Sequence, residues 1–254
     1  MDELEKFKIE VSDRIKLIGD QADLKRIAHN FQHETGNFGY LYNFQWLGLP
    51  IIQYPQDIVA LQELIYQVKP DLIVEAGVAR GGSLIFSASM LAILDMLDQR
   101  VGNEKLNRHV IGIDIDIRPH NRQNIEGHPL SSYISLIQGS SIDPETIAKV
   151  KVAAKGFNNV MVLLDSNHTH DHVLAELRAY SDLVAKGSYL IVYDTVVEHS
   201  PPGYYEGKPW DRGNSPLTAV RKFLSESNDF EIDESVPNKL LITVAPDGFL
   251  RRIK

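Results

Sequence analysis

The chain has 254 residues, of which 43% are hydrophobic and 24% charged, as expected for a soluble globular protein with one α/β domain. Its formal net charge of −8 argues against a general nucleic-acid-binding surface. The absence of cysteine excludes disulfides, zinc–thiolate sites and thiol nucleophiles.

Residues 1–50 are expected to form an extension of a single domain that spans 1–254. The charged start at 1–6 is unlike a signal peptide, and no apolar run reaches transmembrane length, so we expect a cytoplasmic protein. Apolar residues at helical intervals in 2–30 indicate amphipathic helices (Leu4, Phe7, Val11, Ile15, Ile18). These helices could form a lid or an oligomer contact, although packing on the flank of the domain is favoured.

An aromatic, glycine-containing segment occupies residues 33–54. Such segments line ligand pockets but also fill ordinary cores, and both interpretations stay open. Residues 55–69 have a helical pattern that ends before Pro70.

The stretch from Pro70 to Ser83 organises the rest of the chain. The branched residues at 72–74 predict a strand buried on both faces, and this strand ends in Glu75. A glycine-rich turn and an apolar run at 84–94, which predicts a buried helix, follow. Strand, turn and helix together are typical of a Rossmann-like, doubly wound α/β sheet, which binds ligands at the carboxyl ends of its strands.

The glycine spacing in this turn excludes the common phosphate-binding motifs. Gly77-x-x-x-Gly81-Gly82 is neither the dinucleotide pattern nor a phosphate loop. Glu75 would repel a pyrophosphate but could pair with a cationic amino acid group. S-adenosylmethionine carries an ammonium, a sulfonium and no phosphate, so the pattern favours this cofactor; the alternative is that the glycines serve packing alone.

The next strands also end in polar residues. After a polar stretch at 95–108, which is expected to be a loop, residues 109–116 predict a strand that ends in acids. Asp114 is the first candidate to bind ribose hydroxyls, and Asp116 is its competitor. A strand at 131–137 leads to Ser140 and Ser141, which could contact an adenine or simply cap a helix.

The second half of the chain continues the alternation of strands and helices. It predicts buried strands at 160–164 and 188–193 with a helix at 173–186 between them. A long loop at 196–215 and a helix at 217–227 come next. We expect an antiparallel pair of strands, 230–232 with 240–244, to close the sheet.

The best candidates for chemistry are Asp165, His168 and Asp194. The two aspartates end strands expected to be adjacent, and paired carboxylates suit a hard divalent cation such as Mg²⁺. Such a cation can hold substrate oxygens and lower the pKa of a hydroxyl. His168 could then act as the general base. The alternative is that both aspartates are ordinary turn or cap residues.

Several segments together resemble the cephalosporin hydroxylase / rhamnosyl O-methyltransferase family. They are PIIQYP (50–55), QELI (62–65), EAGVARGGS (75–83), LDSNHT (164–169) and VYDT (192–195). The likeness runs from about residue 48 to residue 252. It implies a Rossmann-like fold of the class I methyltransferase type with an N-terminal helical extension, binding S-adenosylmethionine and a divalent cation.

The resemblance also implies roles for individual residues. Glu75, Gly77 and Ser83 would hold the amino acid part of the cofactor, Asp114 the ribose, and Ser140 and Ser141 would lie near the adenine. The candidate cofactor residues also include Arg80, Gly81 and Asp116. Asp165 and Asp194 would bind Mg²⁺, and the Asp165-x-x-His168 spacing resembles the Asp-x-x-Lys of catechol O-methyltransferase, in which the lysine is the base. Tyr193 stands where many family members carry a second acid, so Thr195, an asparagine or additional water molecules are the candidates to complete the ligand set.

The expected function is therefore S-adenosylmethionine-dependent, metal-assisted O-methylation of a sugar or small natural product. His168 and Asp165 are the expected catalytic residues, and a small-molecule or glycoside acceptor is the expected partner. A homo-oligomer with no membrane span and no nucleic-acid partner is also expected. Two alternatives are a metal-dependent hydroxylase with a one-histidine, two-carboxylate iron site, and a non-catalytic nucleoside-binding module.

Overall fold

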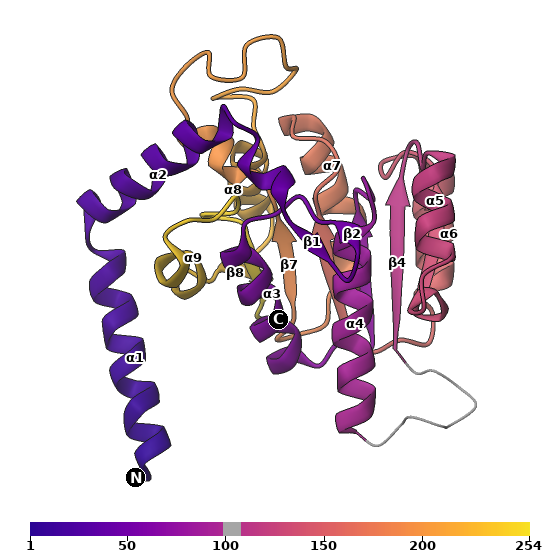
Figure 1. Cartoon of the computed structure of the whole chain (residues 1–254), viewed down its shortest axis with the longest axis horizontal. Helices are drawn as coiled ribbons and strands as arrows, with labels where there is room; N and C mark the ends of the chain where they lie inside the picture. The colour runs from indigo at the N-terminus through magenta and orange to yellow at the C-terminus, as the bar shows by residue number, and fades with distance from the viewer. Residues whose placement is uncertain (99–107) are drawn as a thin grey trace.

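A mixed sheet of seven strands lies at the centre of the structure, a computed structural model that describes residues 1–98 and 108–254 (Figure 1). The strand order is β5-β4-β3-β6-β7-β9-β8, and β9 is antiparallel to both of its neighbours. The strands are β3 (Leu72–Ala76), β4 (His109–Asp114), β5 (Ile134–Gln138), β6 (Val160–Leu164), β7 (Tyr189–Val192), β8 (Phe230–Ile232) and β9 (Phe249–Arg252).

The order of the strands fixes where a ligand can bind. The chain runs outward from β3 through β4 to β5 and then returns to the other side of β3 with β6 and β7. Open α/β sheets bind ligands at such a switch point, outside the carboxyl ends of the strands. The last residue of β3, Ala76, pairs with Ile113 of β4 and Leu164 of β6, so the residues after these strands meet at one edge. The predicted doubly wound fold is confirmed.

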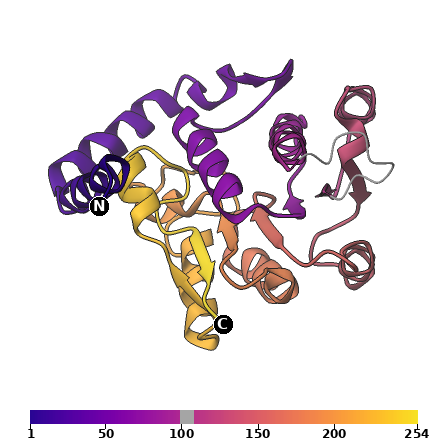
Figure 2. The same ribbon diagram turned by 90° about the horizontal axis from the view of Figure 1, so that it is seen from below.

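Helices cover both faces of the sheet, as Figure 2 shows. One face packs against α3 (Pro55–Val68), α4 (Gly82–Leu97) and α5 (Pro119–Glu126), and the other against α6 (Pro144–Ala153), α7 (His170–Tyr180) and α8 (Pro216–Glu226). Successive strand side chains point to opposite faces, so Ile73 joins one core cluster while Leu72 and Val74 join the other. This is why the central strands are continuously apolar.

Local signals set the beginnings of several helices. Asp143 accepts hydrogen bonds from the amides of Glu145 and Thr146 at the start of α6. Ser215 and Thr218 form a capping box at the start of α8. Pro55, Pro119, Pro144 and Pro216 occupy the first turn of their helices, where no intrahelical N–H bond is lost.

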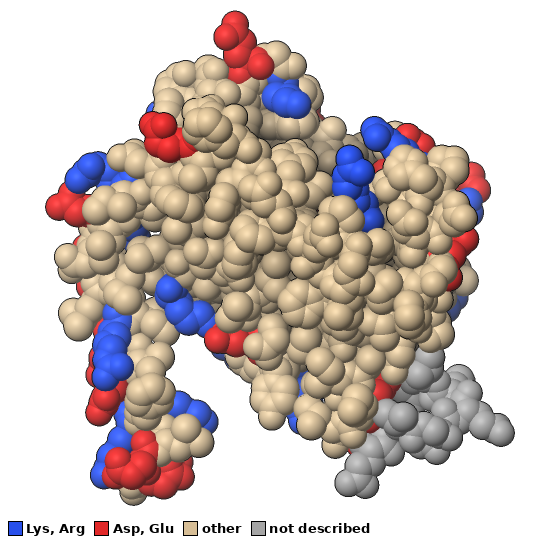
Figure 3. Space-filling model, in the orientation of Figure 1, with Lys and Arg blue, Asp and Glu red and all other residues tan. Residues whose placement is uncertain are grey.

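The N-terminal extension forms two helices, α1 (Glu3–Gly19) and α2 (Ala22–Gly36), as expected. A 3-10 turn, η1 (Tyr40–Asn43), and a short hairpin of β1 (Gln45–Trp46) and β2 (Leu49–Pro50) follow. No residue of α1 is buried, and the helix projects away from the sheet beside α9 (Ser235–Leu240) (Figure 1). Figure 3 shows mixed charges on α1 and a broad, largely uncharged area in the middle of the same view.

The predicted closing strand at 240–244 is wrong. β8 pairs instead with β9, and α9 and an irregular segment separate the two strands. Leu241 has a φ of +59°, which interrupts an extended run, and the Asp57 carboxylate binds Thr243 and the amide of Val244. These residues therefore satisfy their polar groups outside the sheet.

Other boundaries also differ from expectation. Helix α7 begins at His170 and ends at Tyr180, before the turn η3 (Ser181–Leu183), and the 196–215 loop begins inside η4 (Thr195–His199). Helix α4 continues to Leu97, so the predicted 95–108 loop begins later than expected, and its residues 99–107 lie outside the described residues. Across 1–98 and 108–254, no helix combines the length and apolarity needed to cross a bilayer.

Candidate active site

The turn between β3 and α4 is packed directly against the end of β6. Gly77 has a φ of +104°, and a Cβ there would lie 2.0 Å from the carbonyl oxygen of Asp165. Gly81, with a φ of +87°, and Ala79, with a φ of +44°, also adopt left-handed conformations. Glycine at position 77 therefore lets the turn approach the strand end that carries Asp165.

Glu75 lies beneath this turn and is only 2% exposed. Ser83 donates a hydrogen bond to its Oε1, whereas Oε2 is buried without a partner. Burial raises the pKa of Glu75 to about 7, against the hydrogen bond from Ser83, which lowers it. A buried acceptor without a donor is suited to a cationic ligand such as an ammonium group. The residues therefore fit the amino acid end of S-adenosylmethionine.

Asp114 connects the end of β4 to the same turn. Its Oδ2 accepts hydrogen bonds from the amides of Val78 and Ala79 at 2.9 and 3.3 Å, and its Oδ1 accepts one from Asp116 at 3.0 Å. An ionised carboxylate has about four acceptor positions, so Asp114 keeps room for a further donor such as a ribose hydroxyl. Asp114 lines the neighbouring cavity, whereas Asp116 is exposed outside the lining.

This neighbouring cavity has a volume of about 250 Å³. Its lining residues are Ile113, Asp114, Ile115, Ser140, Ser141, Ser166, Asn167 and His172. Ser141 is 5% exposed and donates to Oε1 of Glu176 at 2.5 Å, so its hydroxyl is already engaged in a buried network. The cavity thus places Ser140 and Ser141 beside Asp114, and their contact with an adenine stays a prediction.

Arg80 and Gly81 face a different cavity from the one beside Asp114. Together with Gly77, Ser83 and Asp165 they line a smaller cavity under the hairpin of β1 and β2. Arg80 is exposed at the rim. The predicted cofactor residues are therefore spread along one continuous edge of the sheet, and the roles of the individual residues stay predictions.

Asp165, His168 and Asp194 converge at the ends of β6 and β7. One potential ligand atom from each lies within 4.8 Å of the others, and Nδ1 of His168 is 3.4 Å from Oδ2 of Asp194. Asp194 has a φ of +55°, an uncommon conformation for a residue other than glycine and one that often marks functional sites.

The electrostatics of this cluster favour a cation. Burial and the negative charges of Asp194 and Glu75 raise the pKa of Asp165 well above its usual value. No lysine or arginine among the described residues forms an ion pair with any of these carboxylates. The oxygen-rich donor set fits a hard divalent cation, which would relieve the repulsion.

Two neighbours of Asp194 are turned to other contacts. Tyr193 is 3% exposed and belongs to the core cluster on the α3–α4 face. Thr195 is fully buried, and its Oγ1 accepts a hydrogen bond from the amide of Asp247 at 3.4 Å. The structure thus brings Asp165, His168 and Asp194 together, and Thr195 as a ligand stays a prediction.

Sequence analysis missed the pair His172 and Glu176. They lie four residues apart on one face of α7, with 3.4 Å between Nε2 of His172 and Oε1 of Glu176. Ser166 also donates to Oε1 of Glu176, at 2.6 Å, which links the pair to the end of β6. The spacing of a histidine and an acid at i and i+4 could have signalled the pair.

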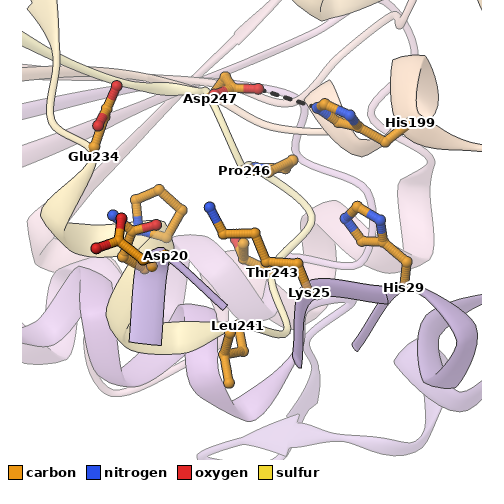
Figure 4. A pocket seen from close by; sticks show the side chains of 12 residues that line it. Asp20, Lys25, His29, His199, Glu234, Leu241, Thr243, Pro246 and Asp247 are labelled. Carbon is orange, nitrogen blue, oxygen red and sulfur yellow. Dashed lines mark hydrogen bonds and ion pairs between the residues drawn. The ribbon is translucent and has the colours of Figure 1, made fainter. Parts of the chain in front are cut away.

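A third cavity, of about 330 Å³, lies between the N-terminal helices, α9 and η4 (Figure 4). It contains none of the residues predicted for the site. In Figure 4 His29 and His199 approach from different segments, with ring centroids 5.6 Å apart, and Nε2 of His199 is 3.0 Å from Oδ2 of Asp247. These contacts connect α2 and the C-terminal segment to η4, which directly follows Asp194.

The sheet order with antiparallel β9, the glycine-rich turn after β3 and the acids at strand ends define a class I methyltransferase. Comparison with known proteins identifies the family within this class to which the chain belongs. The chain belongs to the Rhamnosyl O-methyltransferase/CmcI family, whose model matches residues 38–253. It is therefore an S-adenosylmethionine-dependent O-methyltransferase, and the resemblance found in the sequence is confirmed.

Individual relatives cover most of the chain. It is 27% identical to a rhamnosyl O-methyltransferase of Mycobacterium tuberculosis over 261 residues, covering 94% of this chain and 97% of the relative. A rhamnosyl O-methyltransferase of Mycobacterium leprae is 28% identical over 216 residues, 82% of each chain. The solved structure of CmcI with Mg and S-adenosylmethionine superposes with a TM-score of 0.57 at 22% identity, covering 84% of this chain and 78% of CmcI.

Proposed function

We propose that this enzyme methylates a hydroxyl group of a sugar-bearing small molecule with the help of a divalent cation. The cluster of Asp165, His168 and Asp194, close to the buried Glu75, carries the proposal. The mycobacterial relatives, which are named rhamnosyl O-methyltransferases, support a glycoside as the acceptor. The same naming favours methyl transfer over hydroxylation or ligand binding without chemistry.

Each residue of the site has a proposed task. When bound, S-adenosylmethionine supplies an activated methyl group, and a divalent cation supplies positive charge that favours ionisation of a nearby hydroxyl. Glu75 holds the ammonium of the cofactor through Oε2, and Asp114 holds a ribose hydroxyl. Asp165 and Asp194 hold the cation, and His168 accepts the proton of the acceptor hydroxyl. The protein then contributes mainly orientation and placement of charge.

Metal removal tests the role of the cluster. Labelled S-adenosylmethionine and methyl rhamnosides are incubated with the enzyme in Mg²⁺ or in EDTA, and transfer of the label is measured. A cation at this site would offset the negative charge of the carboxylates and of the ionising hydroxyl. EDTA should therefore lower turnover at least 100-fold, about the loss caused by removing one contact that stabilises charge in the transition state. Equal turnover in both conditions would remove the cation from the proposal.

Variants separate the metal site from general damage. Asp165→Asn and Asp194→Asn should each weaken the heat of Mg²⁺ binding in calorimetry and lower turnover. Asp171, an exposed acid in the first turn of α7, offers a matched control, since Asp171→Asn makes the same chemical change outside the cluster.

Turnover of a catechol in preference to every glycoside would contradict the proposed acceptor class.

A further inference from the structure

Trp210 lies against the proposed general base. Its ring meets His168 edge to face, with centroids 4.7 Å apart and planes at 90°. Trp210 comes from the segment 200–215, here called the site loop, which rises above the carboxyl edge of the sheet (Figure 1). The Trp210 side chain is partly exposed. The exposed Lys208 places its Nζ over the ring, 5.7 Å from the centroid, so a ligand that stacks on this face displaces the ammonium group.

Hydrogen bonds fix the indole in this position. Asn214 donates from Nδ2 to the carbonyl oxygen of Pro209 at 2.8 Å, and its Oδ1 accepts from the amide of His170 at 2.9 Å. The residue before Trp210 is thereby tied to the residue two positions after His168. Glu198 adds a second anchor, because its Oε2 accepts from the amide of Gly213 at 2.9 Å and the hydroxyl of Ser215 at 2.6 Å.

Two further aromatic residues of the site loop pack on α2 and on each other. Tyr204 donates to the carbonyl oxygen of His33 in α2 at 3.1 Å and packs on Tyr205, with ring centroids 5.0 Å apart. Burial raises the pKa of Tyr205 to about 12, and the nearby charge of Asp194 also raises it, while Ser200 lowers it. Because burial is the main cause of the raised pKa, the phenol of Tyr205 keeps its proton at neutral pH.

We propose that Trp210 is an acceptor-binding residue, whose indole stacks against the C–H face of a pyranose ring while a hydroxyl of that ring faces His168. This inference rests on the proposed function and specifies how the acceptor is held. The face of an indole carries partial negative charge and a large apolar area, and both attract polarised C–H groups. A pyranose has one apolar face and a rim of hydroxyls, which matches an indole beside His168 and the carboxylate that contacts this histidine.

The small number of tryptophans makes Trp210 directly observable. The chain contains two, and Trp46 donates to Ser89 on α4 at 3.0 Å and packs on Phe86, away from His168. Trp46→Phe leaves Trp210 as the sole indole, and Trp210→Phe is the matched variant that leaves Trp46. Methyl α-rhamnopyranoside is titrated into each variant with S-adenosylhomocysteine and Mg²⁺ present, and calorimetry measures the same binding independently.

We expect the tryptophan fluorescence of Trp46→Phe to change and then saturate as the glycoside is added. The fluorescence of Trp210→Phe should stay constant. Binding of the glycoside in calorimetry without a change in Trp210 emission would overturn it, as would a response confined to Trp46. If calorimetry detects no binding of any glycoside in a panel of pyranosides, the proposed stacking of a pyranose on Trp210 is wrong.

Kinetics distinguish this inference from the function on which it rests. Trp210→Ala should raise the KM for a glycoside about tenfold and Trp210→Phe less, because a stacked aromatic contact contributes up to about a factor of ten. Affinity for S-adenosylhomocysteine should be unchanged, which also shows that the variants fold. An unchanged KM in Trp210→Ala refutes the inference alone, whereas a wild-type enzyme that methylates no glycoside refutes the proposed function.

Discussion

One unpartnered oxygen, Oε2 of Glu75, connects burial to cofactor binding at the scale of a residue. The carboxyl has a pKa raised to about 7 because it is desolvated beneath the β3–α4 turn. A cationic ligand favours the ionised form, so binding the ammonium of S-adenosylmethionine should release a proton near neutral pH. The affinity for the cofactor should therefore depend on pH.

We expect the affinity of the enzyme for S-adenosylhomocysteine to rise as the pH increases from 6 to 8, through the pKa of Glu75. Glu75→Gln should bind about 10- to 150-fold more weakly, the effect of losing a hydrogen bond to a charged group, and should lose this pH dependence. Calorimetry at several pH values measures both effects. Ser83→Ala keeps the charge but loses a hydrogen bond that lowers the pKa of Glu75, so it should move the pH dependence to higher pH without abolishing it. A wild-type affinity that is flat with pH would contradict the expectation.

At the scale of an element, the β3–α4 turn depends on the absence of a side chain at position 77. A Cβ on Gly77 would overlap the carbonyl oxygen of Asp165, so the turn and the end of β6 cannot move independently. The glycine therefore positions the cofactor turn and the cation cluster relative to one another.

Two alanine substitutions separate steric overlap from backbone strain. Gly77 and Gly156 have φ values of +104° and +94°, but a Cβ at Gly156 meets nothing within 4 Å. Gly156→Ala should cost only the left-handed strain of about 1–2 kcal/mol in the free energy of unfolding. Gly77→Ala should lower the free energy of unfolding by clearly more than Gly156→Ala does. It should also weaken Mg²⁺ binding, because Asp165 must move. Urea denaturation and calorimetry measure the two effects, and equal losses in both variants would show that the overlap is relieved elsewhere.

At the scale of the whole molecule, Asp57 joins parts of the chain that are distant in sequence. This residue of α3 is 1% exposed and accepts hydrogen bonds from Oγ1 of Thr243 at 2.5 Å and the amide of Val244 at 3.0 Å. The carbonyl oxygen of Val244 in turn accepts from the amide of Val196 in η4 at 3.1 Å. Burial raises the pKa of Asp57 to about 7, against both hydrogen bonds, and the charge of Asp194 raises it further.

This raised pKa predicts how stability depends on pH. Between the unfolded pKa of about 4 and the folded value of about 7, the native state holds more protons than the unfolded state. The contribution of Asp57 is therefore complete below pH 4 and is lost as the pH rises through 7, by at most about 1.4 kcal/mol per pH unit. Asp57→Asn should flatten the stability profile from pH 5 to 8 in urea denaturation, while Asp171→Asn should not; identical slopes in wild type and Asp57→Asn would contradict this.

Much of the site could be predicted because it follows from strand periodicity. Glu75, Asp114, Asp165 and Asp194 each come at or just after the end of an apolar run, and parallel strands bring their carboxyl ends to one edge. The closing strand could not be predicted in this way. Residues 240–244 are as apolar as a strand, but the Asp57 carboxylate, far away in the sequence, holds Thr243 and Val244 outside the sheet.

The sequence by itself determined the doubly wound sheet, the family and the order of the acids along the chain, because these depend on local patterns and motifs. Only the tertiary structure decided which carboxylate oxygen lacks a partner, and that Trp210 packs on His168. Such facts depend on contacts between segments far apart in the chain. Burial and the distances between these segments arise only when the whole core is packed, and no local pattern encodes them.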